Sequence, residues 1–159
     1  VSRLLPYKNV DKAVEACNEL GKKLLVVGRG PEKERLEALA GPTVRIVSGI
    51  SDAQLRYAYR HCLALLAISY EDFGITPLEA GASGKAVIAY RAGGFLDTIQ
   101  EGKTGMFINQ PTVEQLVEAL KAFNPTDWDA DYIREHVDGF SEARFISRLK
   151  TYVQALPED

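Results

Sequence analysis

The chain has 159 residues, of which 46% are hydrophobic and 26% are charged, a composition typical of one globular domain with a sizeable core. The formal net charge of −3 argues against a general nucleic-acid-binding protein, which would carry a basic excess. We expect no membrane span, because no apolar run has the required length, and the first residues do not resemble a signal peptide. Cys17 and Cys62 lie in separate helix-like segments, so we expect free thiols in a reducing, cytoplasmic setting.

Short apolar runs alternate with amphipathic segments along the chain. The runs typical of buried parallel strands are 23–27, 44–48, 63–68, 86–90 and 105–109. Between them, segments such as 10–20, 31–39 and 52–62 have apolar residues at helical spacing. This alternation indicates βαβ units. We therefore predict a Rossmann-like, three-layer α/β/α domain with a parallel sheet of about six strands.

The two ends of the chain differ from its middle. The first residues, "VSRLLPYKNV", look like the carboxyl end of a strand that continues into a loop and a helix. The last part, about 127–156, contains two helical stretches with no strand between them. We predict that residues 1–159 form a single domain and that this domain is one half of a larger protein.

The segment "YEDFGITPLEA" (70–80) follows an apolar run, where ligands collect in parallel sheets. We predict Thr76 as the N-cap of a helix, Pro77 as its first residue and Glu79 as its third. Gly74 would let a ligand approach the free amides of the helix start, which favour phosphate. Glu71 and Glu79 could both accept hydrogen bonds from sugar hydroxyls. Alternatively, Glu79 only completes a capping box and Glu71 is only solvated; the spacing leaves both interpretations open.

Two further loops carry charge or glycine after predicted strands. Arg3 and Lys8 flank "LLPY" and could neutralise a diphosphate, although a solvated surface pair is the simpler interpretation of any such two cations. Gly28 and Gly30 follow a strand, but Lys33 stands at the third glycine position of the dinucleotide fingerprint, so we expect no nicotinamide cofactor. A tight turn with close ligand approach explains both glycines.

We find no sequence evidence for a metal site. "DWDAD" (127–131) contains acidic pairs, but it lies far from any strand end, so we interpret it as a helix cap. Cysteine and histidine do not cluster at zinc-like spacing.

Six segments together resemble the carboxyl-terminal domain of retaining GT-B glycosyltransferases of glycosyltransferase family 4. They are "SRLLPYKN", "VVGRGPE", "VRIVSGIS", "YEDFGITPLEAGASGKAVIAY", "RAGGFLDTI" and "EGKTGMFI", in this order, and the resemblance runs from Ser2 to about Phe145. Two glutamates eight positions apart are weak evidence for the family by themselves, but they are specific evidence within this ordered set of segments. The run "EDFGITPLEA" followed by "AYRAGG" is most similar to mannosyltransferases that use GDP-mannose.

The resemblance implies a role for each matching position. Arg3 and Lys8 would bind the donor diphosphate, Glu71 the hydroxyls of the donor sugar, and Glu79 the ribose. Other residues would approach the phosphates, the sugar or the base through their loops and backbone amides. These residues are Gly28, Ser48, Gly49, Ile50, Gly74, Ile75 and Thr76. Ser48 stands where the family usually has glycine, and Gly49 where it has a basic or polar residue.

The implied function is donor binding in an enzyme that transfers mannose from GDP-mannose to a glycan or lipid-linked acceptor, without a metal or other cofactor. The resemblance also implies an N-terminal acceptor domain that this chain lacks, so we expect the chain alone to be inactive. Any membrane association of the longer protein would lie in that domain. The alternatives are a noncatalytic nucleotide-sugar-binding module, or a UDP-sugar transferase, epimerase or phosphorylase on the same frame.

Overall fold

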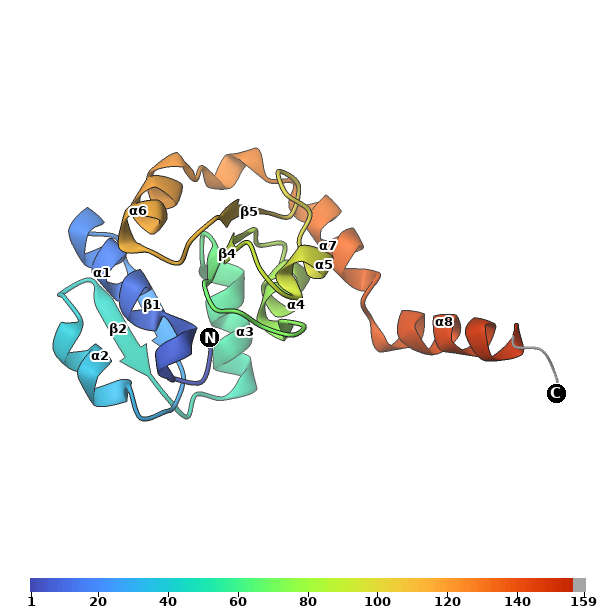
Figure 1. Cartoon of the computed structure of the whole chain (residues 1–159), viewed down its shortest axis with the longest axis horizontal. Coiled ribbons are helices and arrows are strands. Elements are labelled where there is room, and N and C mark those ends of the chain that lie inside the picture. Colours follow the sequence, from blue (N-terminus) through green and yellow to red (C-terminus); the bar gives the residue numbers. More distant parts are fainter. Residues whose placement is uncertain (156–159) are drawn as a thin grey trace.

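The computed structural model describes residues 1–155, which form an α/β body from which the last helix extends (Figure 1). The strands are β1 (Leu24–Val27), β2 (Val44–Val47), β3 (Leu65–Ala67), β4 (Val87–Tyr90) and β5 (Gly105–Ile108). The helices are α1 (Val10–Leu20), α2 (Lys33–Leu39), α3 (Asp52–His61), α4 (Ile75–Ala82), α5 (Phe95–Thr98), α6 (Val113–Ala122), α7 (Ala130–Asp138) and α8 (Glu142–Gln154), with short 3₁₀ turns at Pro6–Lys8 and Pro125–Asp127.

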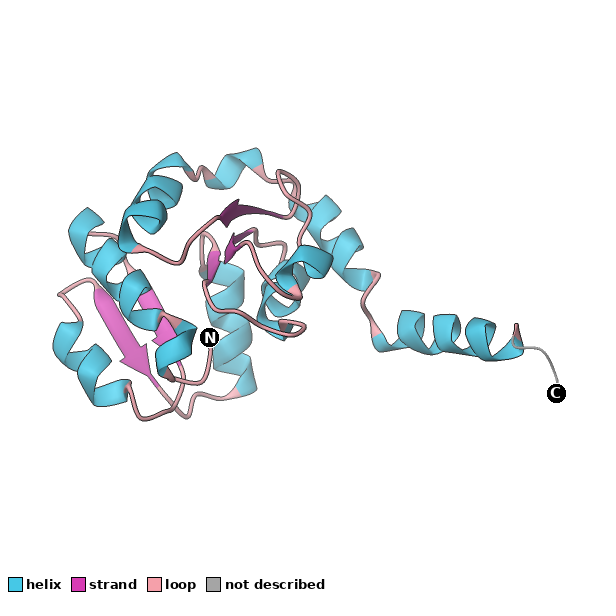
Figure 2. Cartoon of the chain, in the orientation of Figure 1, coloured by secondary structure: helices cyan, strands magenta, loops and turns pink. Residues whose placement is uncertain are grey.

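All strand pairing within residues 1–155 is parallel, which confirms the predicted fold class. β1 pairs with β2, with Leu24 opposite Val44, and β4 pairs with β3 on one side and β5 on the other. Each strand falls within its predicted range. The prediction of one sheet of about six strands differs from the structure, which has a two-stranded and a three-stranded sheet standing apart (Figure 2). The reason is that β1 and β3 do not pair with each other among the described residues.

Helices cover both faces of the strands and give the predicted three layers. Leu65 and Ala67 of β3 pack with Tyr59 of α3 and Ala80 of α4 on one face. On the opposite face, Ile68 packs with residues of α1 and α6. Because successive side chains of a strand point to opposite faces, each short apolar run supplies both layers of the core.

Local capping explains where several helices begin. Ser51 accepts a hydrogen bond from the amide of Gln54, whose side chain accepts from the Ser51 amide, so α3 begins with a capping box. Asp129 accepts hydrogen bonds from the amides of Asp131 and Tyr132, so the acidic segment 127–131 caps α7 as predicted.

The C-terminal helices behave differently from each other. α7 packs against α4, where the side chain of Val137 fills the space beside Gly81. α8 leaves the body of the domain (Figure 1). Its large apolar side chains are exposed. Within residues 1–155, no helix combines the length and apolarity needed to cross a membrane.

Candidate functional site

The first nine residues lie against the carboxyl ends of the strands. The amide of Ser2 donates to the carbonyl of Val27, and the amide of Leu4 donates to the carbonyl of Arg29. Farther along, the side-chain amide of Asn9 donates to the carbonyl of Ile68, just after β3, at 2.9 Å. The segment therefore bridges the ends of β1 and β3, and it brings its two cations close to the loop that follows β3.

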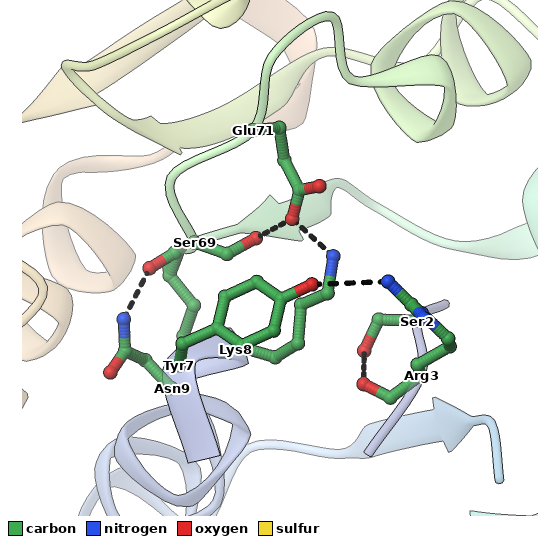
Figure 3. A network of polar contacts seen from close by, with 8 residues as sticks. Ser2, Arg3, Tyr7, Lys8, Asn9, Ser69 and Glu71 are labelled. Atoms are coloured by element: carbon green, nitrogen blue, oxygen red, sulfur yellow. Dashed lines mark hydrogen bonds and ion pairs between the residues drawn. The ribbon is translucent and has the colours of Figure 1, made fainter. Parts of the chain in front are cut away.

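One polar network contains Arg3, Lys8 and Glu71 (Figure 3). These are the residues that the resemblance assigns to the diphosphate and the sugar of the donor. The Lys8 ammonium forms an ion pair with the Glu71 carboxylate, and the hydroxyl of Ser69 donates to the same carboxylate oxygen. The guanidinium of Arg3 lies 3.3 Å from the hydroxyl of Tyr7. The Lys8 ammonium also lies 4.9 Å from the centre of the Tyr7 ring. Tyr7 thus links the two cations.

The network is partly shielded from solvent, which determines what it can bind. The side chains of Lys8 and Glu71 are 10% and 24% exposed, so water screens their attraction less than at an open surface. Arg3 is exposed and pairs with no carboxylate among the described residues. The arrangement offers cations to an anionic ligand, and next to them a carboxylate that can accept hydrogen bonds from hydroxyl groups.

The backbone of Glu71 is held by the loop after β4. The amide of Gly94 donates to the carbonyl of Glu71 at 2.8 Å. A Cβ atom at Gly93 would stand 2.2 Å from that same carbonyl oxygen, and one at Gly94 would stand 2.4 Å from the Cα of Phe73. Two successive glycines are therefore required because the two loops pack backbone against backbone.

The start of α4 corrects the prediction for Thr76. The helix begins at Ile75 with Gly74 as its N-cap, so Thr76 and Pro77 lie inside the first turn. Gly74 has a φ of 80°, and a Cβ there would stand 2.4 Å from the ring of Phe95. A glycine with positive φ packed on an aromatic ring thus sets the helix start, and the hydroxyl of Thr76 makes no capping hydrogen bond. Ile75 is 63% exposed whereas Pro77 is buried, so only the Ile75 side of this first turn faces outward.

Glu79 has a partner other than the one expected from a capping box. Its carboxylate accepts a hydrogen bond of 2.7 Å from the hydroxyl of Tyr59 on α3, so the capping-box interpretation was wrong. The ring of Tyr59 is buried, and burial, followed by the hydrogen bond to Glu79 and its negative charge, raises the pKa of Tyr59 well above its usual range. Glu79 itself is exposed, so its second carboxylate oxygen is available to a ligand.

The remaining predicted positions lie on the loops after β1 and β2. Ser48 and Gly49 are exposed, and Ile50 is half-buried just before α3. The guanidinium of Arg29 lies 3.1 Å from the position that a Cβ at Gly49 would occupy, which places an unpredicted cation beside this loop. At Gly28 a Cβ would stand 2.0 Å from the carbonyl oxygen of Ser2. The close approach at Gly28 is therefore made by the chain's own N-terminal segment.

Sequence reasoning missed four side chains at this edge of the sheets: Tyr7, Arg29, Tyr59 and Ser69. Tyr7 stands between the two predicted cations, and Ser69 lies two residues before Glu71, so their positions gave a usable signal. Tyr59 and Arg29 carry no such signal, because their partners come from other elements.

A parallel α/β domain with cations and carboxylates gathered at the carboxyl ends of its strands belongs to the Rossmann-like, nucleotide-binding class. The comparison with protein families is more specific. The family model described as "Glycosyl transferases group 1" matches residues 1–127, and the chain belongs to this family.

Curated relatives include glycogen synthases and mannosyltransferases. The chain is 34% identical over 130 residues to a glycogen synthase of Pseudomonas syringae pv. tomato. It is 31% identical over 138 residues to the GDP-mannose-dependent alpha-(1-6)-phosphatidylinositol monomannoside mannosyltransferase of Mycobacterium tuberculosis. Each match covers 76% of this chain, but only 27% of the synthase and 36% of the mannosyltransferase. The chain therefore spans about a third of the length of these relatives.

Solved structures confirm that the fold is that of the C-terminal half of GT-B glycosyltransferases. Sucrose-phosphate synthase from Thermosynechococcus elongatus matches with a TM-score of 0.86 and 27% identity, over 97% of this chain and 44% of that one. The Anabaena protein Alr3699/HepE in complex with UDP-glucose matches with a TM-score of 0.81 and 20% identity, over 98% of this chain and 47% of that one. At this identity the second likeness concerns the fold alone.

Proposed function

We propose that the chain is the donor-binding domain of a retaining glycosyltransferase, and that it binds a nucleotide sugar at the carboxyl ends of β1 to β4. The observation that carries this proposal is the network in which Lys8 and Glu71 are paired beside Arg3 and Tyr7. Membership of the glycosyl transferases group 1 family supports it.

The chemistry of each side chain fits one part of such a donor. Arg3 and Lys8 supply positive charge for the diphosphate, and the free amides at the start of α4 add to it. Glu71 can accept hydrogen bonds from hydroxyls of the sugar, and the free oxygen of Glu79 from those of the ribose. As the bond between sugar and diphosphate breaks, negative charge grows on the phosphate, and the nearby cations stabilise it. Residues 1–155 hold no cluster of three or more metal-ligating side chains.

For the donor we propose GDP-mannose, with UDP-glucose as the second candidate. The mannosyltransferase relative and the run "EDFGITPLEA" favour the first. The glycogen synthase relative favours the second. The acceptor would be a glycan or a lipid-linked glycan, bound by another domain of the longer protein.

Calorimetric titration of the chain with GDP-mannose, UDP-glucose, UDP-N-acetylglucosamine and NAD tests this proposal. We expect one nucleotide sugar to bind, NAD not to bind, and the substitution Glu79→Ala to weaken binding. As a matched control, Glu114→Ala removes a carboxylate from the first turn of α6, outside the site. Equal binding of all four compounds, or no effect of Glu79→Ala, would contradict the proposal. Product analysis of the longer protein separates a transferase from an epimerase, a phosphorylase or a noncatalytic module.

A further inference from the structure

A cavity of about 150 Å³ lies at the amino ends of β3 and β4. Its walls come from residues 62–63 and 84–86, which precede these two strands, and from Pro125, Trp128 and Ala130, which follow α6. The residues that we assign to the donor lie at the carboxyl ends of the strands, so this cavity is at the opposite end of the domain. A cavity of this size holds several water molecules or one molecule as large as benzene.

The indole N–H of Trp128, in the wall of this cavity, has no hydrogen-bond acceptor. Its nitrogen is the only buried side-chain nitrogen or oxygen without a partner among residues 1–155. The indole ring stacks on the ring of Phe123, with the ring centres 5.6 Å apart and the planes inclined by 15°, so the indole is held in place. A buried donor without a partner costs free energy, and an acceptor atom in the cavity removes this cost.

Lys85 provides the charge of the cavity. It is half-buried, it is the only charged residue in the walls, and it forms no ion pair within the described part of the chain. Burial raises the pKa of the neighbouring Cys62 thiol, and the positive charge of Lys85 opposes this rise. The thiol already donates to the carbonyl of Tyr59 at 3.3 Å. The cavity therefore offers an ammonium group and an indole N–H to a ligand, and its walls contain no carboxylate.

The acidic side chains of the adjoining segment have partners of their own. Asp127 accepts a hydrogen bond from the side chain of Asn124. Asp129 accepts hydrogen bonds from backbone amides at the start of α7, and Asp131 forms an ion pair with Arg134. None of these three carboxylates lines the cavity. An anion inside it therefore meets the charge of Lys85 without a carboxylate in the same wall.

The remaining walls of the cavity are mostly apolar. Leu63, Ala86, Pro125 and Ala130 contribute to them, and the side chain of Leu63 is 70% exposed at the rim. Covering apolar surface of this kind is favourable, and small-molecule sites combine apolar walls with a few converging polar groups. The walls thus fit a ligand that has an apolar body as well as an anionic group.

We infer that this cavity binds a small organic acid, with one carboxylate and an apolar body no larger than a benzene ring. The carboxylate accepts a hydrogen bond from the indole N–H of Trp128 and pairs with the ammonium of Lys85. The apolar body lies against Leu63 and Pro125. Water alone satisfies the indole N–H but leaves the apolar rim uncovered, and an inorganic anion meets the two donors but not the apolar wall.

A titration followed by NMR tests the inference on the chain of 159 residues. Because Trp128 is the only tryptophan, the single indole N–H signal reports on this cavity and not on the donor site. We expect benzoate to shift this signal with a saturating dependence and a dissociation constant of about 1 mM or less. Benzamide lacks the charge and inorganic phosphate lacks the apolar body, so both should bind at least about fivefold more weakly.

Two substitutions separate the contributions, with affinities measured by calorimetry and folding checked by the thermal midpoint. Lys85→Gln should weaken benzoate binding about fivefold or more, whereas Lys23→Gln, at an exposed lysine outside the cavity, should not change it. Trp128→Phe keeps a ring beside Phe123 but removes the N–H, and should also weaken binding.

Several results would overturn the inference. One is the absence of a saturable shift of the indole signal with benzoate. Another is binding of phosphate or benzamide as tightly as benzoate. The third is an equal effect of the two lysine substitutions, which would indicate general attraction of anions to the surface. Donor binding is measured separately with nucleotide sugars, so none of these results bears on the proposed function.

Discussion

The ion pair between Lys8 and Glu71 predicts that Glu71 opposes the binding of a free nucleoside diphosphate. In the structure, the carboxylate neutralises the cation that we assign to the diphosphate. The substitution Glu71→Gln keeps the size of the side chain and one acceptor oxygen but removes its charge. The Lys8 ammonium is then available to phosphate, and one repulsive charge beside the ligand is lost. We therefore expect GDP or UDP to bind more tightly to this variant.

The size of the effect follows from the exposure of the pair. Opposite charges about 4 Å apart attract by about 4 kcal/mol at an effective dielectric constant of about 20. Exposed pairs contribute only about 0–1 kcal/mol, because water screens them and holding the side chains costs entropy. With side chains 10% and 24% exposed, this pair lies between these limits. We expect a gain of about 1–2 kcal/mol, or about 5- to 30-fold in affinity for the diphosphate.

Calorimetry of GDP and UDP with both proteins, at low and at physiological salt, measures this gain. The matched control is Glu101→Gln, which removes the same charge from a pair with Arg91 whose side chains are 52% and 40% exposed. The control should change affinity little, and any change should disappear at higher salt. Unchanged or weaker diphosphate binding by Glu71→Gln, or an equal gain in the control, would refute this reasoning.

Three further predictions concern the residues that support the site. Tyr59→Phe removes a partly buried hydrogen bond to a carboxylate, so the free energy of unfolding should fall by about 1–2 kcal/mol in denaturant titration; no loss would contradict the geometry. Folding raises the pKa of Tyr59 above its unfolded value of about 10, so Tyr59 contributes fully to stability below pH 10 or so. This contribution decreases as the pH rises above the unfolded pKa, and the decrease should be absent in Tyr59→Phe. Gly93→Ala would place a Cβ 2.2 Å from the carbonyl oxygen of Glu71 at a φ of 56°, and should cost about 2–4 kcal/mol and weaken donor binding. Gly102→Ala is its control, with a φ of 73° and no atom within 4 Å of the new Cβ, and should cost only about 1 kcal/mol; equal losses would contradict the packing argument.

Much of the fold could be predicted from the sequence because local signals agree with one another. Each of the five apolar runs is short, continuous and followed by a loop, as buried parallel strands require. The capping box at Ser51 joins residues three positions apart, so the start of α3 can be predicted from the local sequence. Lys8 and Glu71 could be assigned to one edge of the sheet in advance, because parallel strands bring the loops that follow them to the same edge. Their ion pair was not predicted.

The wrong predictions for Thr76 and Glu79 have a common physical cause, which is contact between segments that are distant in sequence. The helix start at Gly74 depends on the ring of Phe95, and the partner of Glu79 comes from α3, twenty residues earlier. Neither contact leaves a pattern within a local window of sequence. The local signals at Thr76 and Glu79 fit a capping box, but tertiary packing determined the outcome.

The attachment of Glu71 to the loop of Gly93 and Gly94 has a consequence for how this region can vary. The contact is made between backbones, so the position of the Glu71 backbone does not depend on the side chains next to it in sequence. Tyr70 and Phe73, on either side, are 61% and 48% exposed. Substitutions at these two positions can therefore change the shape and polarity of the rim without displacing Glu71. Ligand preference can therefore change through exchange of Tyr70 and Phe73, while the backbone contact that holds Glu71 stays the same.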